Sequence, residues 1–117
     1  MADEIEHYVV TITTNAKKDL REIIAYIAQD NPTHLLCAQT AIKILEKIES
    51  RINALDHLPY RGGYVPELLK KNIKGYRQLL EPPWRIIYKI DKNIVNVLLI
   101  IDSRRNTQDI LIEKLLK

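Results

Sequence analysis

The stretch GYRQLLEPPWRIIYKID, residues 75–91, indicates most about the fold. Pro82-Pro83 divides it into two runs rich in apolar, β-branched and aromatic residues, which predicts two strands, 75–81 and 84–91, paired as a hairpin. Each run carries an aromatic–arginine pair, Tyr76-Arg77 and Trp84-Arg85. Burying an unpaired guanidinium is unfavourable. We therefore expect these arginines either to reach water or to line a surface that needs positive charge, with Tyr76 and Trp84 anchoring the hairpin in the core or at its rim.

Side chains alternate between the two faces of the second strand. One face receives Arg85, Ile87 and Lys89, and the other receives Ile86, Tyr88 and Ile90. We expect Arg85 and Lys89 on an exposed or cleft-lining face, with Arg77 of the partner strand close to them. Tyr88 is expected to point inward or to the rim.

Upstream of the hairpin, HYVVTIT (residues 7–13) predicts a short strand. A helix follows in AKKDLREIIAYIAQD (16–30), capped by Thr14 or Asn15 and ended by Asp30-Asn31-Pro32. Along residues 33–58, apolar residues recur at steps of four and three, which predicts a long amphipathic helix. These residues are Ala41, Leu45, Ile48, Ile52 and Leu55. The short connection predicts that the two helices form an antiparallel hairpin.

Downstream, LPYRGGYVPEL (58–68) predicts a loop, because its prolines and glycines break regular structure. The near-continuous apolar run of residues 93–102 predicts a third strand, buried on both faces at the centre of the sheet. A short helix with Ile110, Leu111 and Leu115 follows, capped at Asn106 or Thr107. The order is β-α-α-β-β-β-α, an α+β fold with helices packed on one face of a small, mostly antiparallel sheet.

The length of 117 residues favours one domain, residues 1–117. Cys37 is the only cysteine, which fits a reducing compartment, and His7, His34 and His57 lack the spacing of metal ligands. We expect no metal and no cofactor. MADEIEHYVV does not resemble a signal peptide, and the longest apolar run, 97–101, is too short to span a membrane. A cytoplasmic protein without a membrane partner is predicted.

Charge is unevenly distributed along the chain. Residues 1–58 hold six Lys/Arg against nine Asp/Glu, whereas residues 59–92 hold eight against three. Five of the seven aromatic residues also fall in this basic segment: Tyr60, Tyr64, Tyr76, Trp84 and Tyr88. Basic residues interleaved with aromatics are typical of surfaces that contact phosphates. The alternative is a solvated sheet face with structural tyrosines.

No nucleophile with a paired base and no glycine-rich phosphate loop is evident. The candidate site is therefore basic: Arg61, Lys74, Arg77, Arg85, Lys89, Arg104 and Arg105. Arginine clamps phosphate through two parallel hydrogen bonds, and several arginines could stabilise a phosphoryl-transfer transition state without metal. The alternative is that these arginines shield a sheet face or pair with acids of a partner.

The segments AKKDLREIIAYIAQDNP, LPYRGG, VPELL, GYRQL, WRIIYKID and VNVLLIIDSRR, taken together, resemble the RelE/ParE superfamily of toxins of type II toxin–antitoxin systems. The resemblance covers nearly the whole chain in the same element order. It implies a small basic toxin in the cytoplasm. A co-encoded antitoxin, whose C-terminal segment wraps the toxin, keeps such a protein silent. An open sheet edge or a groove between helices would suit an extended or amphipathic partner segment.

The superfamily has two branches with different targets. RelE-like members cleave mRNA in the ribosomal A site with basic residues on the sheet and a tyrosine in the C-terminal helix, and ParE-like members poison DNA gyrase. The RelE-type basic residues would fall on Arg77, Arg85 and Arg104 or Arg105. Leu79 stands where a second basic residue is expected, and Ile110 or Leu111 stands where the tyrosine is expected.

We therefore favour a ParE-like toxin of a plasmid stabilisation module, forming a hetero-oligomer with its antitoxin and arresting growth by binding DNA gyrase through the basic residues named above. One alternative is a metal-independent endoribonuclease acting on the translating ribosome with mRNA, with Arg77, Arg85, Arg104 and Arg105 as catalytic residues. The other is a catalytically silent module that only binds the antitoxin.

Overall fold

The computed structural model describes residues 7–29 and 34–116. In chain order the elements are β1 (Val9–Ile12), α1 (Thr14–Gln29), α2 (His34–Asn53), the 3-10 turn η1 (Ala54–Asp56), β2 (Gly63–Tyr64), α3 (Pro66–Leu69), β3 (Arg77–Glu81), β4 (Trp84–Asp91), β5 (Ile94–Asp102) and α4 (Thr107–Leu115). The expected order is confirmed, with β2 and α3 added inside the segment expected to be a loop. The expected stop at Asp30-Asn31-Pro32 lies outside the described residues.

The strands form one sheet in the order β1-β5-β4-β3-β2. β1 pairs parallel to β5, and the other three pairings are antiparallel, so the sheet is mostly antiparallel as expected. The middle strand is β4, which corrects the expectation that residues 93–102 occupy the centre. The reason is that β3, β4 and β5 follow one another as hairpins, and β1 then adds to the free edge of β5.

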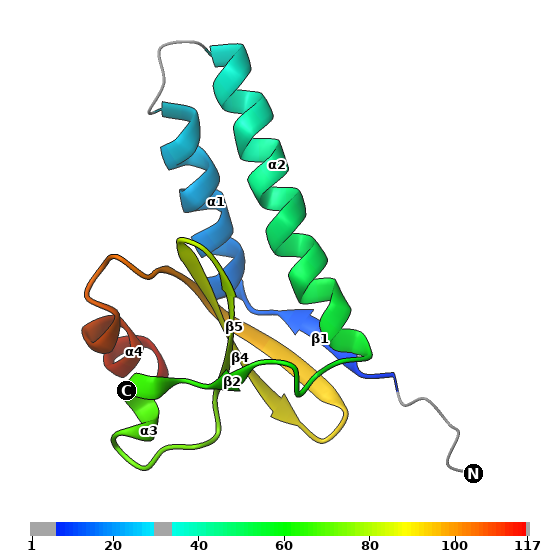
Figure 1. Ribbon diagram of the computed structural model, residues 1–117, viewed down its shortest axis with the longest axis vertical. Helices are drawn as coiled ribbons and strands as arrows, with labels where there is room; N and C mark the ends of the chain where they lie inside the picture. Colours follow the sequence, from blue (N-terminus) through cyan, green and yellow to red (C-terminus); the bar gives the residue numbers. More distant parts are fainter. Residues whose placement is uncertain (1–6, 30–33, 117) are drawn as a thin grey trace.

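Helices cover both faces of the sheet, whereas the sequence suggested one covered face. The hairpin of α1 and α2 packs on one side, where Ile48 and Ile52 meet Ile86 and Tyr88 of β4. The short helices α3 and α4 lie on the other side (Figure 1), over a second cluster formed by Val65, Leu68, Ile87, Leu99, Ile101 and Leu111. This second layer is required because β5 is apolar on both faces.

The long helix buries the stripe expected of it. Ala41, Ile48 and Ile52 are buried, and Leu55 is buried in η1 just beyond the end of α2. At the start of α1 the cap is Thr13, rather than Thr14 or Asn15, because its Oγ1 accepts a hydrogen bond from the Ala16 amide at 3.2 Å. Within residues 7–29 and 34–116, we find no helix with the length and hydrophobicity needed to span a bilayer.

The short C-terminal helix begins as the sequence indicates. Asn106 is its cap, and the Asn106 side chain accepts a hydrogen bond from the Asp109 amide at 3.4 Å. Leu111 is buried, and Ile110 and Leu115 pack at the edge of the same cluster. Packing of α4 on the sheet places the loop 103–106 beside the end of β5, where Arg104 and Arg105 lie.

Candidate functional site

Arg85 is a buried structural residue and does not line an exposed face. It lies on β4 beside Ile87, and only 7% of its surface is exposed. Its Nη1 and Nη2 donate to the two carboxylate oxygens of Glu67, each at 2.8 Å, and its Nε donates to Gln78 Oε1 at 2.9 Å. The expectation of an exposed Arg85 is therefore wrong, because α3 brings Glu67 over it. The same hydrogen bonds lower the pKa of Glu67.

Arg77 lies on the opposite face of the sheet from Arg85. It pairs in register with Tyr88, and residues paired in register share a face. The expectation that Arg77 approaches Arg85 and Lys89 is therefore wrong. The Arg77 Nη1 donates to the Gly62 carbonyl at 2.7 Å. Lys89 stays on the side of Arg85, with its Nζ 5.6 Å from the centre of the Tyr76 ring.

Two tyrosines of the loop and of β2 contact the Arg77 guanidinium. The Arg77 Cζ lies 5.0 Å from the centre of the Tyr60 ring and 4.7 Å from the centre of the Tyr64 ring. Both distances are within the range of cation–π attraction. Both tyrosines are exposed in part. The neighbouring Arg61 and the more distant Lys74 are exposed cations. Arg77 is thus the centre of an aromatic and basic edge of the sheet.

The loop that carries Tyr60 is fixed by a buried hydroxyl. Tyr88 is fully buried, its hydroxyl accepts from the Gly62 amide at 2.9 Å, and it donates to the Pro59 carbonyl at 2.8 Å. Burial raises the pKa of Tyr88, which keeps the hydroxyl neutral and able to donate. A Cβ atom at Gly62 would lie 2.3 Å from the Gln78 carbonyl oxygen, so this position requires glycine.

Arg104 and Arg105 lie at the other end of the sheet, after β5, where Asp102 pairs with Trp84. The Arg104 Nε and Nη2 donate hydrogen bonds to the two carboxylate oxygens of Asp102, at 2.9 Å and 2.7 Å. These hydrogen bonds lower the pKa of Asp102. Arg105 is exposed, and within the part of the chain that the structure describes its guanidinium has no hydrogen bond or ion pair. Of the four arginines proposed as catalytic, only Arg104 and Arg105 are therefore neighbours.

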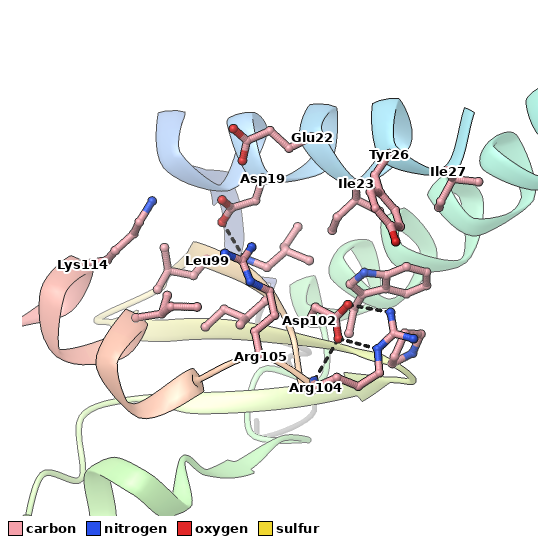
Figure 2. A pocket seen from close by; sticks show the side chains of 15 residues that line it. Asp19, Glu22, Ile23, Tyr26, Ile27, Leu99, Asp102, Arg104, Arg105 and Lys114 are labelled. Atoms are coloured by element: carbon pink, nitrogen blue, oxygen red, sulfur yellow. Dashed lines mark hydrogen bonds and ion pairs between the residues drawn. The ribbon is translucent and has the colours of Figure 1, made fainter. Parts of the chain in front are cut away.

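An open groove of about 1040 Å³ lies beside these two arginines. Helix α1 forms one wall, the end of β5 forms the floor, and the loop 103–106 and α4 form the other wall. Figure 2 shows Asp19 and Glu22 on the α1 wall, Lys114 on α4 and Arg105 below Asp19. The groove therefore has an apolar floor and charges of both signs at its rim.

Asp19 is a partly buried charge of the groove. Its Oδ2 accepts a hydrogen bond from the Ile100 amide at 2.9 Å. Burial raises the pKa of Asp19, and this hydrogen bond and Lys114 oppose the rise. Among the residues described, no group of three or more His, Cys, Asp or Glu side chains could hold a metal ion.

Several residues of these sites were missed by reasoning from the sequence. Glu67 was expected to lie in the loop of residues 58–68, although Pro66 at the first position of a helical turn is a signal for α3. Gln78, the second partner of Arg85, carried no signal. Tyr60 and Tyr64 were counted among the aromatics, but only the tertiary structure brings them to Arg77.

Comparison with known proteins gives a consistent result. The family described as the ParE toxin of the type II toxin–antitoxin system parDE matches residues 10–107. A chain of the chromosomal ParDE toxin–antitoxin system of P. aeruginosa has a similar structure, with a TM-score of 0.64 and 20% identity over 83% of this chain and 97% of that one.

A second similar structure is a chain of the RelBE2 toxin–antitoxin complex of Mycobacterium tuberculosis. Its TM-score is 0.52, with 20% identity over 86% of this chain and 95% of that one. The chain matches none of the curated protein sequences. At these identities the two structures show the fold, and the family match covers most of the chain. The chain belongs to the family of ParE toxins of type II toxin–antitoxin systems.

Proposed function

We propose that this toxin arrests growth in the cytoplasm by binding and poisoning DNA gyrase, and that a co-encoded antitoxin neutralises it in a hetero-oligomer that stabilises the plasmid or locus encoding it. One observation supports a binding mode over RNA cleavage. Of the arginines that a RelE-like nuclease would use, Arg77, Arg85 and Arg104 are held in structural interactions, and the set is spread over both faces and both ends of the sheet.

Catalysis of phosphoryl transfer by arginines requires several free N–H groups directed at one phosphate. Arg85 uses four of its N–H groups on Glu67 and Gln78. Arg104 is occupied by Asp102 at the other end of the sheet. The C-terminal helix also lacks a tyrosine, with Ile110 and Leu111 in the corresponding region. These facts disfavour the endoribonuclease alternative.

The groove beside Arg105 is the proposed docking site of the antitoxin. Its apolar floor suits the apolar side of an amphipathic segment, and Arg105, free of intramolecular partners in the described chain, suits an acidic residue of that segment. Tyr26, which is 65% exposed on the α1 wall, would be covered by the antitoxin.

The decisive experiment is a supercoiling assay with purified gyrase, relaxed plasmid and the chain freed of its antitoxin. We expect inhibited supercoiling or trapped cleaved DNA, and recovery when antitoxin is added first. A parallel measurement maps mRNA 5′ ends in cells after the chain is induced alone. Codon-phased cuts with unaffected gyrase would establish the nuclease alternative. Normal growth after induction would support the alternative of a silent module that only binds the antitoxin.

The antitoxin site has its own test. Arg105→Glu should weaken antitoxin binding measured by titration calorimetry, because the new carboxylate repels the proposed acidic residue. Lys43→Glu, an equal charge change on the exposed side of α2, is the matched control and should bind normally. Normal binding by Arg105→Glu would place the antitoxin elsewhere.

A further inference from the structure

A second surface, distinct from the groove, carries features of a binding site. We call it the tyrosine edge, and it consists of Tyr60, Arg61, Tyr64 and Arg77. Tyr60 is 60% exposed and Tyr64 is 42% exposed, although both contact the Arg77 guanidinium. Exposed rings beside a guanidinium offer flat surfaces on which other planar groups stack.

The tyrosine edge is ordered by its own hydrogen bonds. Tyr88 holds the loop at Pro59 and Gly62, Arg77 donates to the Gly62 carbonyl, and the Arg61 amide donates to the Leu58 carbonyl at 3.2 Å. The Tyr8 ring meets Tyr60 edge-on, with ring centres 6.5 Å apart. A surface that is already ordered loses little conformational entropy when it binds.

The charge around the tyrosine edge is positive. The edge itself contributes Arg61 and Arg77, and residues 57–78 contain a single acid. That acid, Glu67, is bound to Arg85 on the opposite face of the sheet. The adjacent Asp56 is hydrogen-bonded to His57 at 2.6 Å. Such a surface attracts a polyanion.

We propose that the tyrosine edge binds single-stranded DNA, with bases stacked on Tyr60 and Tyr64 and a phosphate bound by Arg61. Stacking accounts for the exposed rings, which an acidic peptide would not require, and the cations account for phosphate attraction. The choice of DNA rests on the proposed function, because a toxin that binds gyrase acts beside the DNA that gyrase holds, and single strands are specified because only unpaired bases can stack on the rings. Arg77 positions the rings and is not assigned to the ligand.

The test measures fluorescence anisotropy of a labelled oligodeoxythymidine with the full chain and no gyrase. Tyr60→Ala and Tyr64→Ala should each weaken binding about five- to 150-fold, and Tyr60→Phe should retain it. Arg61→Glu should weaken binding and reduce the slope of log affinity against log salt by about 1. The matched control Lys43→Glu, on the exposed side of α2, should bind normally. Thermal unfolding of each variant shows that the fold is intact.

Three outcomes would overturn the proposal. An abasic oligonucleotide that binds as tightly as the thymidine oligonucleotide would exclude stacking. Tighter binding of oligouridine would assign the surface to RNA, and full displacement by polyglutamate at equal charge would assign it to an acidic protein. The anisotropy assay contains no gyrase, so its result is independent of the supercoiling assay. If DNA binding is not found, gyrase inhibition can still be observed, and if gyrase inhibition is not found, DNA binding can still be observed.

Discussion

Replacement of Arg85 by methionine tests the view that this arginine is structural. Methionine has a similar length but donates no hydrogen bond. The change leaves the Glu67 carboxylate and the Gln78 amide oxygen without the donors they have at 2.8–2.9 Å. We expect the free energy of unfolding to fall, because both partners remain at a site where Arg85 itself is only 7% exposed.

The size of the effect follows from the burial of the pair. Removing one partner of a buried ion pair destabilises a protein by about 3–5 kcal/mol. The Glu67 side chain is 26% exposed, so water compensates in part, and we expect about 2–3 kcal/mol. In a domain of this size 1 kcal/mol shifts Tm by about 4 °C, which gives a loss of about 8–12 °C.

The assay is thermal and urea unfolding followed by circular dichroism. Arg105→Met, at an exposed arginine, is the matched control and should unfold like the unmodified chain. The double variant Arg85→Met/Glu67→Leu should recover part of the loss, since no carboxylate is left unpaired. A Tm for Arg85→Met within about 2 °C of the unmodified chain would refute the structural role, because it lies far below the predicted loss.

The same variants separate structure from catalysis in cells. If Arg85→Met abolishes growth arrest only by unfolding the toxin, the stabilised double variant should regain toxicity. If Arg85 acts on RNA, the double variant should stay harmless although it is folded. Toxicity of Arg85→Ala alone cannot distinguish these explanations, because that variant loses both the guanidinium and the ion pair.

Three further predictions concern the loop and the ion pair. Gly62→Ala should destabilise the chain by about 2 kcal/mol in urea unfolding, because the new Cβ would collide with the Gln78 carbonyl, whereas Gly63→Ala, with open space, should be neutral. Tyr88→Phe should cost about 1–2 kcal/mol by leaving two backbone groups of the loop unpaired, and an unchanged urea midpoint would contradict this. Because the pKa of Glu67 is lowered in the folded chain, ionised Glu67 stabilises the fold at pH values above the usual glutamate pKa near 4.5. This contribution is lost as the pH falls through the folded-state pKa. The Tm difference between the unmodified chain and Arg85→Met should therefore shrink on acidification.

The main elements of the fold were predictable because they have regular periods. The apolar stripe of α2 and the alternation of side chains along β4 each repeat over many residues, so neither pattern is expected to arise by chance. β2 has two residues and α3 has four, too few for a period to show. Yet α3 carries Glu67 to Arg85, and β2 carries Tyr64 to Arg77. The elements that determine the environment of the arginines were therefore the ones too short to show a period in the sequence.

The faces of β4 were predicted correctly, but their exposure was not. Alternation tells which side chains share a face, and Arg85 does share one with Ile87. Exposure depends on what packs over that face, which is a tertiary property. The apolar residues of β5 on both faces already implied a second layer of helices, and α3 and α4 form that layer.

The groove and the tyrosine edge should act independently, since they lie at different places along the sheet. Trp84 lines the groove, whereas Arg77 pairs with Tyr88, four residues and about 13 Å farther along β4, and no residue of the tyrosine edge lines the groove. Arg105→Glu should therefore weaken antitoxin binding and leave DNA binding unchanged, and Arg61→Glu should do the reverse. Each variant serves as the control of the other, with titration calorimetry and anisotropy as the two readouts. A variant that impairs both would show that one surface serves both partners, and the antitoxin would then act by covering the DNA-binding residues.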